Sequence, residues 1–459
     1  MTPNRLSWLV EPGSPSRELA DLFDAAGYQF FLVGGSVRDA FLDRDHADLD
    51  FATDALPPAT RKIVSRWADE VYRVGEAFGT IKVHKRSLRA EITTFRSEIY
   101  RDESRKPTVT YSSTISEDLS RRDFTINAIA LRLPALETAD PYGGLQDLAV
   151  GRLDTPLDPD ISFSDDPLRM LRLFRFHATL GFEIVPRVWD AATRLSPRLQ
   201  IISAERIRDE LSKLIVARAP SSALLGVVKT GLADWFLPEL GALAMAQDPV
   251  HQHKDVLSHS LAVLDKTRPE LTIRLAALLH DIGKPATREY GPEGVSFHHH
   301  EVVGQRMARD RLRALRYSKE LIDDVGRLVF LHLRPHTLRM GWSDAAVRRY
   351  VRDAGDLLES LNELVRCDVT TANARKADDI SRRIDELELR IEELGKQEEL
   401  DSLRPPIDGH QVMERLGIKP GPLVGEIMEL LYERRIEGGP FSAEEALAMV
   451  EDWYNERSH

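Results

Sequence analysis

Residues 29–53, QFFLVGGSVRDAFLDRDHADLDFAT, decide the fold of the first part of the chain. The run QFFLV predicts an apolar strand that ends at Gly34 and Gly35, and SVRDAFLDR predicts a short helix. HADLDFAT alternates polar and apolar residues, which predicts a second, half-buried strand. This order of strand, turn, helix and strand indicates an α+β unit.

The residues that follow complete this unit. Two further strands are predicted over 80–86 and 88–96 because apolar residues alternate there. The polar stretch 97–107 has no periodicity and predicts a mobile loop. We expect a helix over 120–131, SRRDFTINAIAL, and a turn-rich segment over 140–151, DPYGGLQDLAVG.

From Asp165 onward the pattern becomes helical. DDPLRMLRLFRFHATLGF has apolar residues at helical spacing and a stop at Gly181. Residues 376–394 carry a short heptad-like seam, which predicts one long helix that Pro405 and Pro406 end. The predicted parts are a small mixed sheet with helices, an all-α neck, an all-α body and a helical tail, over 1–152, 153–245, 246–403 and 404–459.

Composition excludes several classes of protein. The chain has 459 residues, with 62 Lys and Arg against 74 Asp and Glu, a formal net charge of −12. The apolar runs are far shorter than the ~20 residues of a membrane-spanning helix, and the first residues lack the apolar core of a secretory signal. A single cysteine, Cys367, excludes an intrachain disulfide and a CxxC metal site. We therefore expect a soluble cytoplasmic protein that makes no membrane contact.

The charge is unevenly distributed. Residues 169–218 hold ten basic and five acidic residues, a local net charge of +5. An acidic total argues against a nucleic-acid partner. This basic segment nevertheless predicts a local, salt-sensitive surface for the phosphates of a folded RNA.

Two carboxylates two residues apart mark the first candidate site. Asp48 and Asp50 face the same side of the predicted strand, and they repel each other unless a cation lies between them. Paired carboxylate oxygens suit Mg²⁺, which also takes phosphate oxygens and water. The alternative interpretation is a solvated acidic strand end. Glu91, on the neighbouring strand pair, is either a third carboxylate or a surface residue.

The turn before this pair is a candidate phosphate site. Gly34 and Gly35 precede a helix, so backbone N–H groups can surround a phosphate, and Arg38 adds a fixed positive charge. A plain tight turn is the alternative.

Four polar residues recur every three positions further along the chain. Asp166, Arg169, Arg172 and Arg175 predict a drifting polar strip on one helix. A carboxylate and a guanidinium together offer acceptors and donors that can pair with a base edge without a template. A solvated helix face is the alternative, although three of the four residues are Arg.

Residues 29–53 resemble the head motif of the polymerase-β-like nucleotidyltransferases. They are closest to the class II tRNA nucleotidyltransferases (CCA-adding enzymes) and the bacterial poly(A) polymerases. SRRDFTINAIAL, DPYGGLQDL, DDPLRMLRLFRFHATLGF and SAERIRDEL resemble the next blocks, in family order. The resemblance implies untemplated nucleotidyl transfer from CTP and ATP to tRNA 3′ ends, with two Mg²⁺ ions and release of pyrophosphate.

The resemblance also implies individual roles. Asp48, Asp50 and Glu91 would be catalytic, with the two aspartates holding Mg²⁺. Asp123 would select the ribose 2′-OH, and Asp166 with Arg169 would recognise the base. The residues expected to bind the nucleotide are Gly34, Gly35, Arg38, Arg122, Asp123, Asn127, Asp166, Arg169, Arg172 and Arg175.

The polar stretch 97–107 bears on specificity. Family members that add the final A have a flexible loop at this place, and members that add only CC tend to lack it. Arg101, Asp102, Glu103, Arg105 and Lys106 make a charged loop here, which favours complete CCA addition. A plain surface loop is the alternative.

Histidine and aspartate residues in the second half resemble those of HD phosphohydrolase domains. The order H…HD…D implies metal ligands, which are His259, His280, Asp281 and Asp368, with His300 and His332 for a second metal. Mixed His and carboxylate ligands suit a divalent transition metal better than Mg²⁺ alone. Two interpretations remain: an active phosphohydrolase of cyclic phosphates or phosphomonoesters, and a fold retained without catalysis.

Three functional hypotheses follow. The first is a CCA-adding tRNA nucleotidyltransferase whose partners are tRNA, ATP and CTP. The second is a poly(A) polymerase of the same family. The third is an HD phosphohydrolase whose head merely binds RNA.

Overall fold

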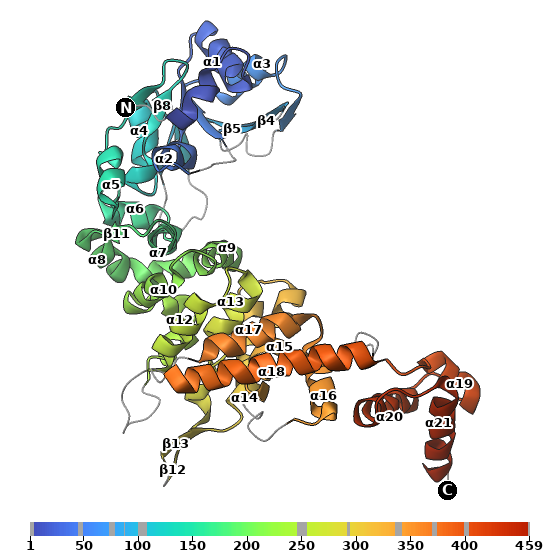
Figure 1. Cartoon of the computed structure of the whole chain (residues 1–459). Helices are drawn as coiled ribbons and strands as arrows, with labels where there is room; N and C mark the ends of the chain where they lie inside the picture. The colour runs from blue at the N-terminus through green and yellow to red at the C-terminus, as the bar shows by residue number, and fades with distance from the viewer. Residues whose placement is uncertain are drawn as a thin grey trace. The chain divides into compact units, whose positions relative to one another are not determined.

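The computed structural model describes residues 4–44, 49–72, 79–86, 88–99, 108–245, 255–291, 294–335, 342–369, 374–398 and 404–457. The chain divides into two compact units, Met1–Gly241 and Ala242–His459. Figure 1 shows the main sheet in the first unit and a helical second unit. Within the described ranges, no helix is long and apolar enough to cross a membrane.

A mixed sheet organises the first unit. Its seven strands, counted in the described residues, have the order β3-β4-β5-β2-β1-β8-β9, and only β2 and β5 are parallel neighbours. The strands are β1 (Phe30–Val33), β2 (Leu49–Thr53), β3 (Glu70–Tyr72), β4 (Thr80–Lys85), β5 (Leu88–Thr94), β8 (Ala130–Arg132) and β9 (Glu137–Ala139). The strands predicted over 80–86 and 88–96 are confirmed.

The centre of the sheet is buried on both faces. On one face, Phe30 stacks against Phe23 of α1 (Pro15–Ala25) at 4.5 Å and against Phe51 at 4.8 Å between ring centroids. On the other face, Phe31, Val33, Ala52 and Phe95 pack with Leu119 of α4 (Ile115–Ser120). Asp50 lies two residues before Ala52, so it belongs to this second face, where it is half-buried.

Three local predictions are wrong. Residues 120–131 are not one helix: α4 ends at Ser120, a 3₁₀ turn η3 covers Thr125–Asn127, and β8 follows. The reason is that Ala130 and Leu131 pair with β1, and sheet pairing overrides an apolar run that has no distinct period. Residues 140–151 contain a helix, α5 (Gly144–Val150), rather than only turns.

The third error concerns the loop predicted over 97–107. Its first residues belong to β6 (Arg96–Ile99), which pairs with β7 (Thr108–Tyr111) as an antiparallel ladder. The remainder of the predicted loop, including its charged residues, lies outside the described residues.

Helices follow the sheet in the first unit. As predicted, α7 (Leu168–Leu180) ends at Gly181, whose φ of 74° is the left-handed conformation that favours glycine. The other α-helices of this unit are α2 (Gly35–Phe41), α3 (Pro57–Val64), α6 (Pro159–Asp165), α8 (Pro186–Leu195), α9 (Ala204–Ile215), α10 (Pro220–Lys229) and α11 (Pro238–Ala242). A short parallel pair, β10 (Arg152–Leu153) and β11 (Glu183–Ile184), lies among them.

The described residues of the second unit are helical apart from one hairpin. The long helix predicted over 376–394 is confirmed as α18 (Ala374–Glu398), with Ile384, Leu387 and Leu394 buried on its inner side. Its other elements are α12 (Val256–Lys266), α13 (Leu271–Leu279), β12 (Arg288–Gly291), β13 (Gly294–Phe297), α14 (His300–Ala314), α15 (Lys319–Leu331), α16 (Asp344–Ala354), α17 (Leu358–Asp368), α19 (Gly409–Leu416), α20 (Pro422–Gly438) and α21 (Ala443–Arg457).

The last three helices have a core of their own. Ile407, Val412 and Ile427 are among the buried residues of this cluster. Arg348 of α16 ties it to the rest of the unit by donating a 2.9 Å hydrogen bond to the carbonyl oxygen of Ile436.

The close packing of α10 against α7 in the first unit can be tested by mutation. A methyl group at Gly226 would lie 2.3 Å from the buried ring of Phe174, so we expect Gly226→Ala to cost about 1–3 kcal/mol of stability by overpacking. Scanning calorimetry measures the change. Gly425→Ala is the control because no atom lies within 4 Å of its added methyl, and it should gain about 0.5–1 kcal/mol. An unchanged melting temperature for Gly226→Ala would contradict this packing.

Candidate nucleotide site and candidate metal centre

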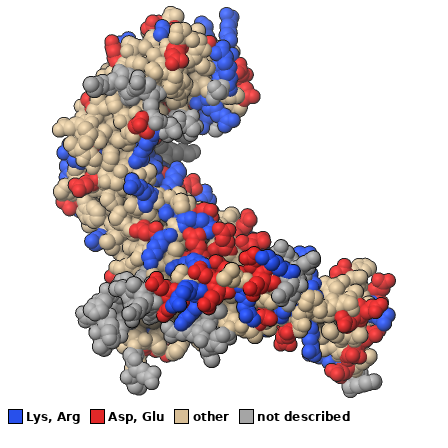
Figure 2. Space-filling view, viewed as in Figure 1, with Lys and Arg blue, Asp and Glu red and all other residues tan. Residues whose placement is uncertain are grey.

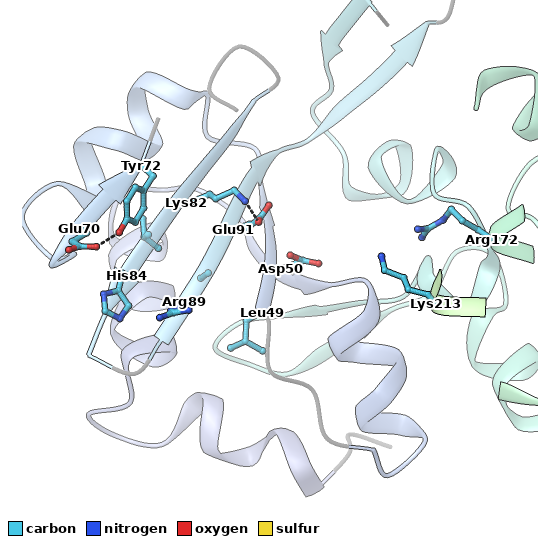
Figure 3. Close-up of a pocket in the computed structure, with 12 residues that line it drawn as sticks. Leu49, Asp50, Glu70, Tyr72, Lys82, His84, Arg89, Glu91, Arg172 and Lys213 are labelled. Carbon is cyan, nitrogen blue, oxygen red and sulfur yellow. Dashed lines mark hydrogen bonds and ion pairs between the residues drawn. The ribbon is translucent and has the colours of Figure 1, made fainter. Parts of the chain in front are cut away.

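Strand register places a row of polar side chains across one face of the sheet. Asp50 pairs with Glu91, Glu91 with Lys82, and Lys82 with Tyr72. The Lys82 ammonium lies 2.5 Å from the Glu91 carboxylate. These side chains line a cavity of about 790 Å³ that Arg172 also lines (Figure 3). Glu91 is therefore a neighbour of Asp50, and Asp48 lies outside the described residues.

The glycine turn lies against Asp50. Gly34 has a φ of 79°, and a side chain there would meet Arg122 Nη1 at 3.0 Å and Asp50 Oδ2 at 3.7 Å. A glycine is needed for the backbone conformation and for this close approach. Gly35 begins α2 directly after it. The turn, Asp50 and Arg122 thus converge as a phosphate site requires.

A hydrogen-bonded chain joins the head to α7. Arg38 Nη1 donates to Asn127 Oδ1 at 2.7 Å, and Asn127 Nδ2 donates to Asp123 Oδ1 at 2.8 Å. Arg172 completes the chain through Asp123 Oδ2 at 2.6 Å. Burial alone would raise the pKa of Asp123, but Arg172 and the Asn127 hydrogen bond outweigh it and hold that pKa well below its usual range.

Glu210 of α9 extends this network. Its buried carboxylate lies 3.2 Å from the Arg172 guanidinium and 2.6 Å from that of Arg175. The guanidinium carbons of Arg38, Arg172 and Arg175 lie 5.1, 5.5 and 4.0 Å from the centroid of the Phe176 ring. The Phe176 ring therefore helps to fix the guanidinium groups of Arg38, Arg172 and Arg175, and the Glu210 carboxylate holds the last two.

The predicted polar strip on one helix is wrong at Asp166, which lies outside the helix that carries Arg169, Arg172 and Arg175. Pro167 forces Asp166 out of the helical region, to a φ of −138°, so Asp166 precedes α7. Asp166 instead pairs with Arg206 at 2.7 Å. Arg169 is buried, and its guanidinium donates to Ser162 Oγ at 2.9 Å and to the carbonyl oxygen of Arg121. The two residues expected to recognise the base are bound to protein atoms in this structure.

Three contributors were missed from sequence. Glu210 falls on the apolar side of α9, between Ile207 and Leu214, and a lone carboxylate on such a face is a signal that could have found it. Phe176 offered no signal beyond lying beside the arginines. Lys82 could be recognised only from the strand register.

The second unit gathers all six predicted HD ligands. His259 comes from α12, His280 and Asp281 from the end of α13, and the others from three further helices: His300 from α14, His332 from the end of α15 and Asp368 from α17. They form two groups, His259 with His280 and Asp368, and Asp281 with His300 and His332. Within each group the ligand atoms lie within 4.8 Å of one another.

The donor set fits divalent metals. Nδ1 of His280 and of His332 each lies against a carbonyl oxygen three residues earlier, at 2.8 and 2.6 Å, so each Nε2 carries the lone pair. His259 Nε2 and His280 Nε2 are 3.1 Å apart, and His332 Nε2 is buried with no hydrogen-bond partner among the described residues. Two imidazole nitrogens this close, as the Nε2 atoms of His259 and His280 are, need a proton or a cation between them.

The electrostatics of this cluster agree with a cation. Burial disfavours a charged His280, but Asp281 and Asp368 outweigh it and raise the pKa of His280 to about 10. Burial and the positive charge on His280 lower the pKa of His332 to about 3. The site thus attracts one positive charge strongly and keeps the His332 imidazole neutral, as a metal ligand requires.

Removing Arg172 tests the network in the first unit. Arg172→Met leaves Asp123 and Glu210 buried with less compensation, so it should cost about 3–5 kcal/mol. Burial then raises the pKa of Asp123, and the loss should be larger at about pH 7 than at about pH 4.5 because ionisation becomes the costly state. Urea unfolding at the two pH values measures this.

A matched variant controls for the loss of an arginine. Arg187→Met removes a half-exposed ion pair with Asp154, worth under about 1 kcal/mol. Equal losses for the two variants would contradict the special role of Arg172.

Comparisons with known proteins identify family models that match both units of the chain. Residues 30–154 match a family model described as Poly A polymerase head domain, and residues 181–243 match one described as Probable RNA and SrmB- binding site of polymerase A. Residues 256–373 match the HD domain.

Two curated relatives are similar over nearly their whole length. An A-adding tRNA nucleotidyltransferase from Deinococcus radiodurans is 32% identical over 440 residues, 93% of this chain and 95% of the relative. A CC-adding tRNA nucleotidyltransferase from Thermus thermophilus is 33% identical over 444 residues, 92% and 93% of the two chains. A CCA-adding enzyme from Levilactobacillus brevis is 38% identical over 229 residues, 50% of this chain and 56% of the relative.

Solved structures share the fold. The CCA-adding enzyme of Bacillus stearothermophilus in complex with CTP has a TM-score of 0.66 at 24% identity and covers 97% of this chain and 98% of its own. The Thermotoga maritima CCA-adding enzyme complexed with tRNA has a TM-score of 0.60 at 19% identity and covers 99% of each chain. The predicted fold, a polymerase-β-like head followed by helices with an HD region, is confirmed. Nucleotidyltransferase and HD domains generally require divalent metals. The chain belongs to the tRNA nucleotidyltransferase and poly(A) polymerase family and is a nucleotidyltransferase with an appended HD domain.

Proposed function

We propose that this enzyme adds C, C and A to the 3′ end of tRNA, using CTP and ATP without a template. The observation that carries the proposal is the meeting of Asp50 and Glu91 with the Asp123–Arg172 network around one cavity. The full-length similarity to two tRNA nucleotidyltransferases supports tRNA as the acceptor.

The side chains position the nucleotide. Arg122 and the Gly34 turn lie beside Asp50, where they can bind and neutralise the triphosphate. Arg172 and Arg175 are held by Glu210, so they can present donors to a base without losing side-chain entropy in that step. Asp123 lies buried between these groups, suited to accept a ribose hydroxyl after a local exchange of partners.

We propose Asp48 and Asp50 as the metal ligands in the head, since their oxygen atoms suit Mg²⁺, with Glu91 as a third catalytic carboxylate. Bound there, Mg²⁺ supplies activation of the RNA 3′-OH and neutralisation of the departing pyrophosphate. The protein contributes alignment: strand register fixes Asp50 and Glu91 as direct neighbours on one sheet face. No protein nucleophile is needed for this reaction.

The two full-length relatives favour partial addition as the second candidate. One is named for adding A and the other for adding CC, so this chain, which resembles both equally, could share either restriction. A poly(A) polymerase is less well supported, because the curated relatives carry names of tRNA enzymes. We place the reaction in the cytoplasm, since tRNA is the relatives' substrate.

Incorporation assays decide between these activities. A labelled tRNA lacking its last three nucleotides should gain two nucleotides with CTP alone, and a third when ATP is added, as resolved on sequencing gels. Addition that stops after two residues with both nucleotides present would identify a CC-adding enzyme. Extension only of a tRNA that already ends in CC would identify an A-adding one, and long A tails a poly(A) polymerase.

Asp50→Asn tests the chemical site in the same assay. Loss of a charged ligand should lower kcat on the order of 10³-fold or more, because charge neutralisation provides most of the rate. Glu137→Gln, an exposed residue of β9 outside the cavity, should retain the wild-type rate.

We propose a divalent transition-metal site with phosphohydrolase activity for the HD cluster. The supporting observation is the gathering of His259, His280 and Asp368, in which the Nε2 atoms of the two histidines lie 3.1 Å apart. Cyclic phosphates and phosphomonoesters, including those at RNA ends, are the expected substrates.

Metal binding and hydrolysis are measured separately. Mn²⁺ or Ni²⁺ at a hundredfold excess over Kd should raise the free energy of unfolding of the wild type by about 2.7 kcal/mol, seen as a higher melting temperature. The same ions should support hydrolysis of 2′,3′-cyclic AMP. His259→Gln and His332→Gln should lose both effects, whereas His410→Gln, exposed on α19, should lose neither. Stabilisation without hydrolysis would identify a retained metal site that is not catalytic.

A further inference from the structure

The cavity in the first unit extends well beyond the nucleotide site. Of the residues expected to bind the nucleotide, only Arg172 lines it. Figure 3 shows Asp50 near the middle, Arg172 and Lys213 on one side, and Tyr72, His84 and Arg89 on the other. The part of the cavity that Tyr72, His84 and Arg89 line lies outside the proposed nucleotide site.

Strand register makes this second part a regular surface. One row runs from Asp50 through Glu91 and Lys82 to Tyr72. Three steps between strands, at ~4.8 Å each, separate the first and last residues of this row by roughly 14 Å. A neighbouring row on the same face contains Arg89, His84 and Glu70, since Arg89 pairs with His84 and His84 with Glu70.

The exposed side chains of this surface are of the types that contact single-stranded nucleic acid, an aromatic ring and basic groups. Tyr72 is 49% exposed, and its hydroxyl donates to the Glu70 carboxylate, which fixes the ring beside the cavity. Arg89 is exposed, and its guanidinium has no ion pair with any other described residue. Lys82 adds an ammonium that is about half-exposed despite its pair with Glu91.

The reaction itself requires an acceptor on this side. In phosphoryl and nucleotidyl transfer the attacking and leaving oxygens are roughly in line, so the RNA 3′ end and the pyrophosphate lie on opposite sides of the reacting phosphorus. The Gly34 turn, proposed to bind the triphosphate, follows β1 on one side of β2, and Lys82 and Tyr72 lie in β4 and β3 on the other side. The strands that carry Lys82 and Tyr72 are therefore placed to receive the 3′ end opposite the departing pyrophosphate.

We propose that Tyr72, Lys82, His84 and Arg89 form a subsite for the single-stranded 3′ end of the acceptor RNA, an inference that rests on the proposed nucleotidyl transfer. Tyr72 stacks on a base near the end of the strand, and Arg89 and Lys82 contact its phosphates. A sheet face with exposed aromatic side chains is an established platform for single-stranded RNA. About 14 Å of surface accommodates several nucleotides at their ~3.4 Å stacking distance.

Steady-state kinetics with two substrates test the subsite. With a tRNA that ends at the nucleotide before CCA, Tyr72→Ala should raise KM for the RNA by about 5- to 100-fold, the loss expected for one stacking contact. Arg89→Gln should also raise KM for the RNA, with a loss that shrinks as salt is added, because it removes a phosphate contact. KM for CTP should change less than about twofold, because these residues lie across Asp50 from the nucleotide site. Tyr72→Phe should restore most of the RNA affinity, since it keeps the ring.

Controls separate the possible failures. Arg66→Gln, an exposed arginine of the same unit outside the cavity, should behave as the wild type. If the wild type incorporates no nucleotide into any RNA, the proposed function is wrong. If the wild type extends tRNA and Tyr72→Ala and Arg89→Gln do so with unchanged KM for RNA, the subsite is wrong. A rise in KM for CTP instead would show that this surface binds the incoming nucleotide.

Discussion

The ion pair between Asp123 and Arg172 is the interaction on which the nucleotide site depends. It joins the segment after α4 to the helix α7, and both partners are largely removed from water. Neither charge is tolerable there alone, so the pair forces the sheet and the following helices into one arrangement. Asn127 donates to the other Asp123 oxygen and Glu210 pairs with Arg172, which carries the same constraint to Arg38 and Arg175. The cavity is the space left between this network and the strand face that bears Asp50.

In the second unit, buried opposite charges are also paired, and there histidines carry part of the positive charge. A fully buried Asp281 is stable as a carboxylate because His280 and Lys284 surround it, and these neighbours hold its pKa well below the usual value. His280 cannot leave this network without exposing that charge. In both units buried opposite charges hold neighbouring segments together, and in the second unit the same residues group ligand atoms that can hold a metal ion.

Local pattern predicted much of this molecule and failed for identifiable reasons. The strand, turn and helix around Gly34 were predictable because period and turn chemistry agree there. The residues after α4 were not, because pairing with β1 is a long-range contact that overrides a helix-like run. Asp166 left the expected helix because Pro167 follows it. The surface with Tyr72 was not predicted, because it depends on the pairing register of the consecutive strands β3, β4 and β5, which the local pattern does not give. The HD ligands were all named from the resemblance, yet only the structure places their lone pairs.

The electrostatic coupling between Asp123 and Arg172 is the claim that a single measurement tests most directly. A double-mutant cycle with Asp123→Asn, Arg172→Met and the double variant, measured as kcat/KM for CTP on a tRNA acceptor, gives this coupling. The account predicts strong non-additivity, with each single change costing nearly as much as the two together, because either one dismantles the same pair. Costs that simply add would contradict it, since the two residues would then act on the nucleotide independently.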